Sequence, residues 1–228
     1  MKALVLEENA KLIYRDVPEP AVPRSGDESG WAQIKIDAAG ICGSDITRGF
    51  HNGAYHYPLV MGHEFAGTVV ETGKSGGTGP RRVAVFPLLP CRRCEACLNG
   101  DYAQCVDYDY LGSRRDGGFA EYVRVPEENL FTVPEHVSQE QAAMTEPCAV
   151  ALHGVRKLEI QPNSTAVVLG GGPIGNLAAQ WLRIRGCGSV SVIDIDKKKL
   201  EIAANMGFET AAQPDGADIA VEACGVPV

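Results

Sequence analysis

Hydrophobic and polar residues alternate over short stretches in the first part of the chain. Residues 34–37 alternate strictly, 65–70 and 83–89 are rich in β-branched and aromatic residues, and 119–125 alternate again. A period of two is typical of strands with one buried face, and the glycine and proline residues between these runs mark turns. We therefore predict that the chain is mainly β up to about residue 135.

From Ser138 onwards the pattern becomes helical. Ser138 followed three residues later by Gln141 is a capping-box signature, which predicts a helix beginning at this point. The helical pattern continues to about Leu158, and Pro147 should kink it because proline cannot donate the backbone hydrogen bond. The pattern of hydrophobic and polar residues thus changes from strand-like to helical near Ser138, which we predict to be close to the domain boundary.

A βαβ unit follows the helix. Residues 165–169 form an apolar strand, apolar positions recur at helical spacing over 174–182, and a second apolar strand covers 189–195. A further helix is predicted over 197–206, and 218–223 has the composition of another strand. This order of elements predicts strands connected by crossover helices.

The end of the chain holds one conflict. Gly207 suits the position just after the helix over 197–206. Only six residues separate 209–211 from a strand that begins at Asp218, whereas parallel neighbours need a crossover of about a dozen residues or more. We expect either that 209–211 is not a strand of this sheet, or that a connecting helix is missing here.

Composition excludes several classes of function. The 228 residues are 45% hydrophobic, which is ample for a buried core in one or two domains. The net charge is −8 and the only dense basic cluster is 197–199, so we expect no nucleic-acid partner. No apolar run approaches the roughly 20 residues that cross a bilayer, so we expect no membrane span. Eight cysteines in such a chain predict reduced thiols and metal sites in a cytoplasmic protein.

Four of the cysteines form a C-x2-C-x2-C-x7-C run within residues 90–106, at Cys91, Cys94, Cys97 and Cys105. This spacing suits four thiolates around one zinc ion, and a site with four protein ligands organises structure. Disulfides are disfavoured because the four apolar residues before Glu7 are too few for a secretory leader. An iron–sulfur cluster is disfavoured because seven residues precede the fourth cysteine and Val106, not proline, follows it.

A glycine-rich turn lies between the predicted strand at 165–169 and the helix after it. Gly170, Gly172 and Gly175 match G-x-G-x-x-G, a pattern that is weak alone and informative in this context. The glycines suit a tight turn, close approach of the backbone to a pyrophosphate, and close packing of helix on strand. The predicted dinucleotide contacts in this turn are Gly170, Gly172, Pro173, Ile174 and Gly175.

Asp194 predicts which dinucleotide is bound. It comes 19 residues after Gly175, at the end of the next strand, where a carboxylate can accept from both adenosine ribose hydroxyls. The same carboxylate would repel a 2′-phosphate. We therefore predict NAD, while the lysines at 197–199 argue faintly for NADP.

Three further motifs, GICGSD, GHE and TEP, carry side chains of the kind that bind metals. Cys42, His63 and Glu146 could supply a thiolate, an imidazole and a carboxylate, and three protein ligands plus water make a catalytic zinc site. The three residues span about a hundred positions, so their meeting cannot be read from the sequence. Each alone also suits a buried thiol, a core histidine or an exposed acid.

The order GICGSD, GHEFAG, four-cysteine lobe, DGGFAEY, Glu-Pro and GGGPIG resembles the zinc-dependent medium-chain dehydrogenases over nearly the whole chain. NGAYHYP, PLLPC and YDYLGSRRDGGFAEY are most similar to the polyol and polyol-phosphate dehydrogenases of that superfamily. The resemblance implies an α/β plus mainly-β fold, with a GroES-like catalytic domain over 1–155 and a Rossmann domain over 156–228. Members of the superfamily continue past the position of Val228, so we expect the Rossmann domain to be partial.

The resemblance also implies roles for individual residues. By motif position the catalytic zinc ligands would be Cys42, His63 and Glu146. Glu64 is similar to the family's adjacent acid, which can approach or exchange at the metal, so the choice between the two carboxylates stays open. Asp45 would orient the imidazole of His63. Ser44 would pass the substrate proton outward.

These roles imply a zinc ion that polarises a secondary alcohol while NAD accepts the hydride. Arg114 and Arg115 are candidates for holding a substrate phosphate, because guanidinium groups match phosphate oxygens; a solvated turn with salt bridges is the alternative. The specific polyol is not encoded in any motif. Relatives are commonly dimers or tetramers, which implies a homo-oligomer. A second interpretation is a zinc-binding fragment with weak or no catalysis.

Overall fold

The computed structural model divides the chain into two compact units, Met1–Glu146 and Pro147–Val228. The division falls inside helix α4 (Thr145–Val155), earlier than the boundary after residue 155 expected from the sequence. No helix of the described residues is long and apolar enough to cross a membrane. The structure describes residues 1–22, 30–73, 80–211 and 216–225.

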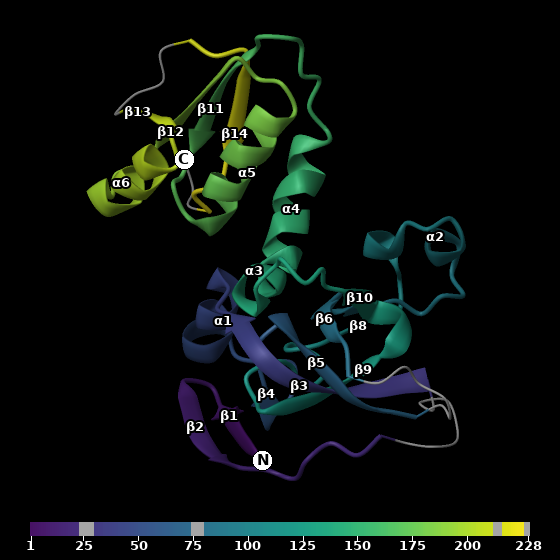
Figure 1. Cartoon of the computed structure of the whole chain (residues 1–228). Coiled ribbons are helices and arrows are strands. Elements are labelled where there is room, and N and C mark those ends of the chain that lie inside the picture. The colour runs from purple at the N-terminus through teal and green to yellow at the C-terminus, as the bar shows by residue number, and fades with distance from the viewer. Residues whose placement is uncertain (23–29, 74–79, 212–215, 226–228) are drawn as a thin grey trace. The chain divides into compact units, whose positions relative to one another are not determined.

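The first unit is built on antiparallel sheets (Figure 1). The sheets have the strand orders β10-β6-β5-β3-β9, β2-β1-β4 and β7-β8. The mainly β character predicted for this part is confirmed. The strands are β1 (Lys2–Glu8), β2 (Lys11–Asp16), β3 (Trp31–Gly40), β4 (Leu59–Val60), β5 (Glu64–Thr72), β6 (Arg82–Val85), β7 (Leu88–Leu89), β8 (Asp109–Tyr110), β9 (Tyr122–Pro126) and β10 (Leu130–Thr132).

The core of the first unit forms where the alternating residues turn inward. Ile34 of β3 is fully buried and its neighbour Lys35 is exposed, as the period of two predicts. The run over 83–89 is divided between β6 and β7 at Phe86-Pro87, since proline cannot donate a ladder hydrogen bond. The main cluster of buried side chains includes Ile34, Phe65, Val69, Val83, Val85, Val123 and Val125.

Short helices connect these strands. The capping box at Ser138 is present: its hydroxyl accepts from the amide of Gln141, whose side chain accepts from the Ser138 amide. The predicted single kinked helix is instead two helices that meet at Met144, and Pro147 lies in the first turn of the second, where its missing N–H costs least. The helical segments are α1 (Gly43–Thr47), η2 (Arg48–Asn52), α2 (Glu95–Leu98), η3 (Tyr102–Gln104), η4 (Glu127–Asn129), α3 (Gln139–Ala143) and α4.

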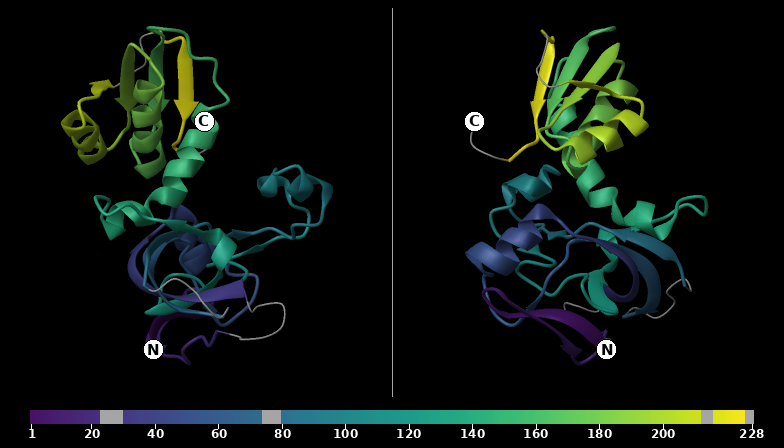
Figure 2. Two further views of the ribbon diagram at one scale, coloured as in Figure 1. Left: turned by 45° about the vertical axis from the view of Figure 1, so that its right-hand side comes forward. Right: turned by 90° about the vertical axis from the view of Figure 1, so that its left-hand side faces the viewer.

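The second unit is a parallel sheet with the strand order β13-β12-β11-β14. Its elements are β11 (Thr165–Leu169), α5 (Pro173–Ile184), β12 (Ser189–Ile193), α6 (Lys197–Asn205), β13 (Glu209–Ala211) and β14 (Ile219–Glu222). The crossovers through α5 and α6 advance in the same direction across the sheet, so both helices cover one face of it (Figure 2). This is the Rossmann-like arrangement that the βαβ pattern predicts.

The expected conflict near the end of the chain has a topological answer. β13 pairs in parallel with β12, so the first alternative, that 209–211 is not a sheet strand, is wrong. β14 pairs in parallel with β11, which places β13 and β14 on opposite edges of the sheet. The two strands are nonetheless parallel to each other, so the chain still has to return across the sheet between them, and the second alternative, a missing connecting helix, stays a prediction. Residues 212–215 lie outside the described residues.

Candidate metal and dinucleotide sites

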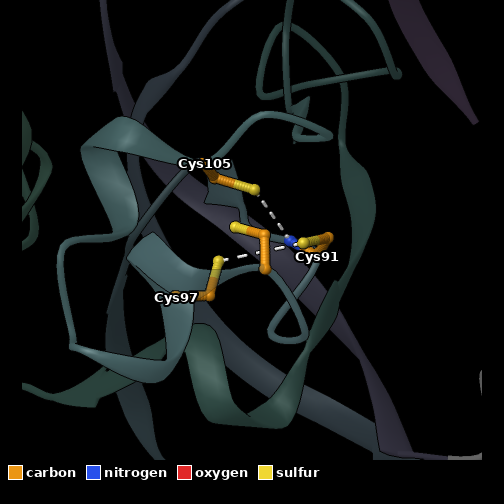
Figure 3. A group of neighbouring side chains, drawn as sticks. Cys91, Cys97 and Cys105 are labelled. Atoms are coloured by element: carbon orange, nitrogen blue, oxygen red, sulfur yellow. Dashed lines mark hydrogen bonds between the residues drawn. The ribbon is translucent and has the colours of Figure 1, made fainter.

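The four cysteines of the lobe over 90–106 converge. Their sulfur atoms all lie within 4.8 Å of one another, and the Sγ atoms of Cys91 and Cys97 are 3.9 Å apart (Figure 3). Zinc–thiolate bonds of about 2.3 Å in a tetrahedron require sulfur separations of about 3.8 Å. All eight cysteines are free thiols. The lobe therefore fits a four-coordinate zinc that needs no other ligand.

Backbone amides prepare the lobe for a cation. The amide of Cys91 donates to the sulfur of Cys105 at 3.2 Å. Hydrogen bonds from the backbone of Val106 and of Cys97 lower the pKa of the Cys94 thiol to about 6. Since the thiolate is the form that binds metal, these backbone hydrogen bonds favour the metal-binding form of Cys94.

A second ligand group lies in the same unit, at Cys42, His63 and Glu64. One ligand atom of each residue lies within 4.8 Å of the other two. His63 is buried, while Cys42 and Glu64 are half-buried. A thiolate, an imidazole nitrogen and a carboxylate make the donor set of a catalytic zinc site, so these residues fit such an ion.

The register between β3 and β5 brings the group together. Gly40, the last residue of β3, is directly opposite Glu64, the first residue of β5. Cys42 follows β3 as the N-cap of α1, while His63 immediately precedes Glu64. A Cβ atom at Gly40 would lie 2.4 Å from Oε2 of Glu64. Glycine at this position therefore makes room for the carboxylate.

The DGGFAEY motif holds the segment that carries His63. The amide of Gly117 donates to the carbonyl of Val60, and the amide of Gly118 donates to that of Gly62, both at 2.8 Å. A Cβ at Gly117 would lie 2.1 Å from the Gly62 carbonyl oxygen, so only glycine permits this approach. Gly62 itself has φ of +92°, a conformation that favours glycine. The glycines of both motifs thus fix the backbone beside the imidazole.

Asp45 lies behind the imidazole, as the sequence predicts. Its side chain is 2% exposed, and its Oδ1 is 3.4 Å from Nδ1 of His63, which leaves Nε2 as the nitrogen for a metal. Its Oδ2 accepts from the amide of Cys42 at 3.0 Å. Burial lowers the pKa of His63, but hydrogen bonds to Asp45 and Cys42 outweigh it and raise that pKa to about 10. The same contact with His63 lowers the pKa of the Cys42 thiol.

Glu146 is not a member of the group, although it lies near it. Its Oε1 accepts from the hydroxyl of Tyr110 at 3.3 Å. The ring of Tyr110 packs edge-on against His63, with the centroids 5.9 Å apart. Burial raises the pKa values of both Glu64 and Glu146. The geometry therefore places Glu64 among the ligand atoms and Glu146 beside the hydroxyl of Tyr110. Sequence reasoning assigned no role to Tyr110.

A cavity of about 460 Å³ is lined by residues of α1 and η2, which follow Cys42 in the chain. Ser44 is exposed and lines the cavity, as a residue that passes a proton outward requires. Hydrogen bonding to Ser44 contributes, after the larger effect of His63, to the lowered pKa of Cys42. Arg48 also lines the cavity, and sequence reasoning missed it.

The two arginines predicted to hold a phosphate have different environments. Nε of Arg115 donates to Oδ2 of Asp109, so this guanidinium is in an ion pair. The guanidinium of Arg114 lies over the ring of Tyr55 at 4.6 Å and over that of Tyr108 at 4.7 Å. Both arginines line a cavity of about 650 Å³ next to the four-cysteine lobe.

The glycine turn of the second unit has the geometry of a dinucleotide site. Gly170 has φ of +106°, and a Cβ at Gly175 would lie 1.8 Å from the Gly170 carbonyl oxygen. A Cβ at Gly172, the N-cap of α5, would meet nothing within 4 Å, so open space lies at the start of the helix beside Pro173 and Ile174. A pyrophosphate fits such a helix N-terminus.

Asp194 follows β12 and faces the turn. Its Oδ2 accepts from the amide of Gly171 at 2.8 Å, and its Oδ1 accepts from the amide of Asp196 at 2.8 Å. Nζ of Lys199 is 3.5 Å from Oδ2. Burial raises the pKa of Asp194, but these donors outweigh it and the net shift is downward. The side chain thus stays a carboxylate, the form that the predicted contact with an adenosine ribose requires.

Both fold and site define a class of protein: a GroES-like β domain with two candidate zinc sites, joined to a Rossmann-like sheet with a dinucleotide turn. The alcohol dehydrogenase GroES-like domain matches residues 28–135. The chain belongs to the zinc-dependent medium-chain dehydrogenase superfamily. Sorbitol dehydrogenase of Bacillus subtilis (strain 168) is 33% identical over 249 residues, which cover all of this chain and 69% of that enzyme.

Two further relatives extend the comparison. Galactitol 1-phosphate 5-dehydrogenase of Escherichia coli (strain K12) is 44% identical over 177 residues, or 77% of this chain. A zinc-binding dehydrogenase structure from Sinorhizobium meliloti 1021, bound to NADP, matches with a TM-score of 0.90 and 31% identity over 99% of this chain and 70% of its own. The chain spans 51% of the length of the Escherichia coli enzyme.

Proposed function

We propose that this chain contributes the zinc and dinucleotide sites of an oxidoreductase that transfers hydride from a secondary alcohol of a polyol or polyol phosphate to NAD. The observation that carries the proposal is the convergence of Cys42, His63 and Glu64, with Asp45 behind the imidazole. Residues from two separate motifs meet there with the donor types of a catalytic zinc. The named relatives that act on polyols support the substrate class.

Cys42 and His63 would hold the catalytic ion, and Glu64 offers the carboxylate nearest to them. A zinc bound there supplies Lewis acidity to the alcohol oxygen. Glu146 as a ligand stays a prediction, because Tyr110 holds it outside the group. The buried Asp45 would keep the imidazole in the orientation and tautomer that leave Nε2 free for the ion.

The proton and the hydride leave the substrate by different routes. Ser44, exposed at the cavity beside Cys42, would take the hydroxyl proton and pass it to solvent. The hydride on the same carbon would go to the nicotinamide of a dinucleotide whose pyrophosphate lies at Gly172. Asp194 would accept from the adenosine ribose, and its ionised side chain favours NAD.

The test is NADH formation by the full chain with a panel of polyols and polyol phosphates, before and after chelation. We expect turnover with at least one secondary alcohol, its loss on chelation, and its return when zinc is added. The same assay with NADP measures the cofactor preference. Turnover that survives complete removal of both zinc ions would contradict the proposal.

The second candidate is a zinc-binding fragment with weak or no catalysis. Metal analysis separates the two functions: two zinc ions per chain support the oxidoreductase, and one supports the fragment. The cytoplasmic location, the homo-oligomer and the phosphate contacts of Arg114 and Arg115 stay predictions. Removing both guanidiniums should lower the preference for a polyol phosphate if those contacts form.

A further inference from the structure

Arg48 is a largely buried cation that faces one carboxylate, that of Asp45, without a hydrogen bond to it. The side chain is 17% exposed and belongs to the first turn of η2, directly after α1. Its Nη1 is buried, and within the described residues it has no hydrogen-bond partner. Oδ1 of Asp45 is 3.8 Å from Nη1, close enough for an ion pair but beyond hydrogen-bond range. Buried donors are normally satisfied, so Nη1 has the capacity to donate to a further acceptor.

The cavity beside Arg48 offers several donors to an anion. Ser44, Thr47, Asn52 and Tyr55 line the same 460 Å³ space, together with Gly53 and Ala54. Hydroxyl and amide groups can donate to phosphate oxygens, and a guanidinium can hold two of them at once. No acidic residue lines this cavity within the described residues. The space therefore combines hydroxyl and amide donors with one cation.

The other arginines of the unit are less suited to this task. Arg115 is paired with Asp109, and Arg114 is stacked on Tyr55 and Tyr108 in the cavity beside the lobe. Arg48 lines the cavity that Ser44 also lines, next to Cys42. Tyr55 lines both cavities, so the two spaces adjoin at its ring.

We infer that Arg48 is the specificity-determining residue that binds the phosphate group of a polyol phosphate substrate in this cavity. The inference rests on the proposed function and replaces Arg114 and Arg115 as the principal phosphate contact. Carboxylates crowd this part of the molecule: Asp45, Glu64 and Glu146 all act electrostatically on the groups around His63. These carboxylates repel a dianionic phosphate, so it binds here only where a nearby cation offsets the repulsion. Arg48 is the cation that lines this cavity.

Binding of inorganic phosphate to the zinc-loaded full chain tests the inference without any turnover. Isothermal titration is carried out on the wild type, Arg48→Met, Arg114→Met and Arg183→Met. Arg183 is the matched control, since its guanidinium stacks on Phe208 in the second unit. We expect saturable binding by the wild type and a loss of about tenfold or more in Arg48→Met, the value of one charge-assisted hydrogen bond. Zinc content and melting temperature are measured for every variant.

The outcomes separate this inference from the proposed function. No saturable binding by the wild type, an unchanged affinity in Arg48→Met, or a larger loss in Arg114→Met would overturn it. If Arg48→Met does not retain zinc, Arg48→Lys is the deciding variant. It keeps a positive charge beside Asp45 but loses the planar guanidinium that can bind two phosphate oxygens, so the affinity for phosphate should still fall. Where alcohols are oxidised, Arg48→Met should lower the ratio of kcat/KM for galactitol 1-phosphate over galactitol by about tenfold or more. An unchanged ratio with normal turnover sinks the inference and leaves the oxidoreductase intact.

Discussion

The four-cysteine lobe and the Cys42 group are two candidate metal sites of opposite construction in one unit. The lobe takes all of its ligands from a single loop, Cys91 to Cys105, and its sulfur atoms all lie within 4.8 Å of one another. The second group takes Cys42 from the end of β3 and His63 with Glu64 from the start of β5. It also depends on Asp45, Tyr110 and the glycines around Gly62.

The difference shows how ligand origin separates structural from reactive sites. A loop that closes four ligands on one ion stabilises itself and leaves no position for a substrate. A site assembled across a sheet is held by its surroundings, so it can keep fewer ligands and border a cavity. The predictions below test this division, beginning with the largest effect.

Replacing a ligand of the reactive site should remove chemistry and spare the fold. In Cys42→Ala we expect zinc to fall from two ions per chain to one, and kcat/KM to fall by at least about a thousandfold, which corresponds to the several kcal/mol that a Lewis-acidic ion supplies. The melting temperature should change little, because Cys42 is only half-buried. Metal analysis, kinetics and calorimetry check this; retention of two zinc ions would break the comparison.

Replacing a ligand of the lobe should instead destabilise the fold. In Cys97→Ala one zinc ion is lost, and we expect about 4 kcal/mol or more of unfolding free energy to go with it, as for other structural metals. Denaturant unfolding measures the change, and limited proteolysis should cut between Cys91 and Cys105. Cys224→Ala, which removes an exposed thiol, is the control. Equal stability of the two variants would show that the lobe does not depend on its ion.

Asp45→Asn tests the support of the imidazole. The asparagine side chain keeps an oxygen that can accept from the backbone N–H of Cys42, but it lacks the negative charge that faces Nδ1 of His63. We expect zinc affinity at the reactive site to fall about 10–100-fold, while the lobe retains its ion. Competition with a graded series of chelators measures the two affinities separately. Loss of both ions in parallel would mean that the two sites are not independent.

Gly40→Ala tests the space reserved for Glu64. The new Cβ would lie 2.4 Å from a carboxylate oxygen, which is the free end of a flexible side chain, so the carboxylate should move and the strands should stay. We expect zinc affinity at this site to fall about tenfold, the lower end of the range for such support. Gly154→Ala, with nothing within 4 Å of its Cβ, should stabilise α4 by about 0.5–1 kcal/mol and leave zinc affinity unchanged. An unaltered affinity in Gly40→Ala would argue that Glu64 is not a ligand.

The sequence predicted those parts of the molecule that depend on local spacing. The capping box at Ser138, the turn at Gly170 to Gly175 and the clustering of Cys91 to Cys105 all appear as expected. Each is a pattern of neighbours within about fifteen residues, where chain geometry alone decides which groups meet. The helix break at Met144 departs from this, because the sequence pattern marked Pro147 as the point of disruption.

The parts that the sequence left open depend on register and packing. The grouping of Glu64 with Cys42 and His63 follows from the pairing of Gly40 with Glu64, while Glu146 contacts the hydroxyl of Tyr110. Which of the two carboxylates binds the ion stays a prediction. Arg48 carries one local signal, since a spacing of three residues places it on the same helix face as Asp45. Tyr110 carries no such local signal beyond its place in a motif. No pattern in the sequence predicts that its hydroxyl contacts the carboxylate of Glu146.

The contrast in ligand origin also sets an order in which the ions can be taken up during synthesis. All four ligands of the lobe lie in one loop, so they can meet as soon as the ribosome has released Cys105 and without the register between β3 and β5. The other site needs that register and also the DGGF segment at 116–119, whose amides secure the backbone ahead of His63. We therefore expect the structural position to take up its ion first, above all where zinc is scarce.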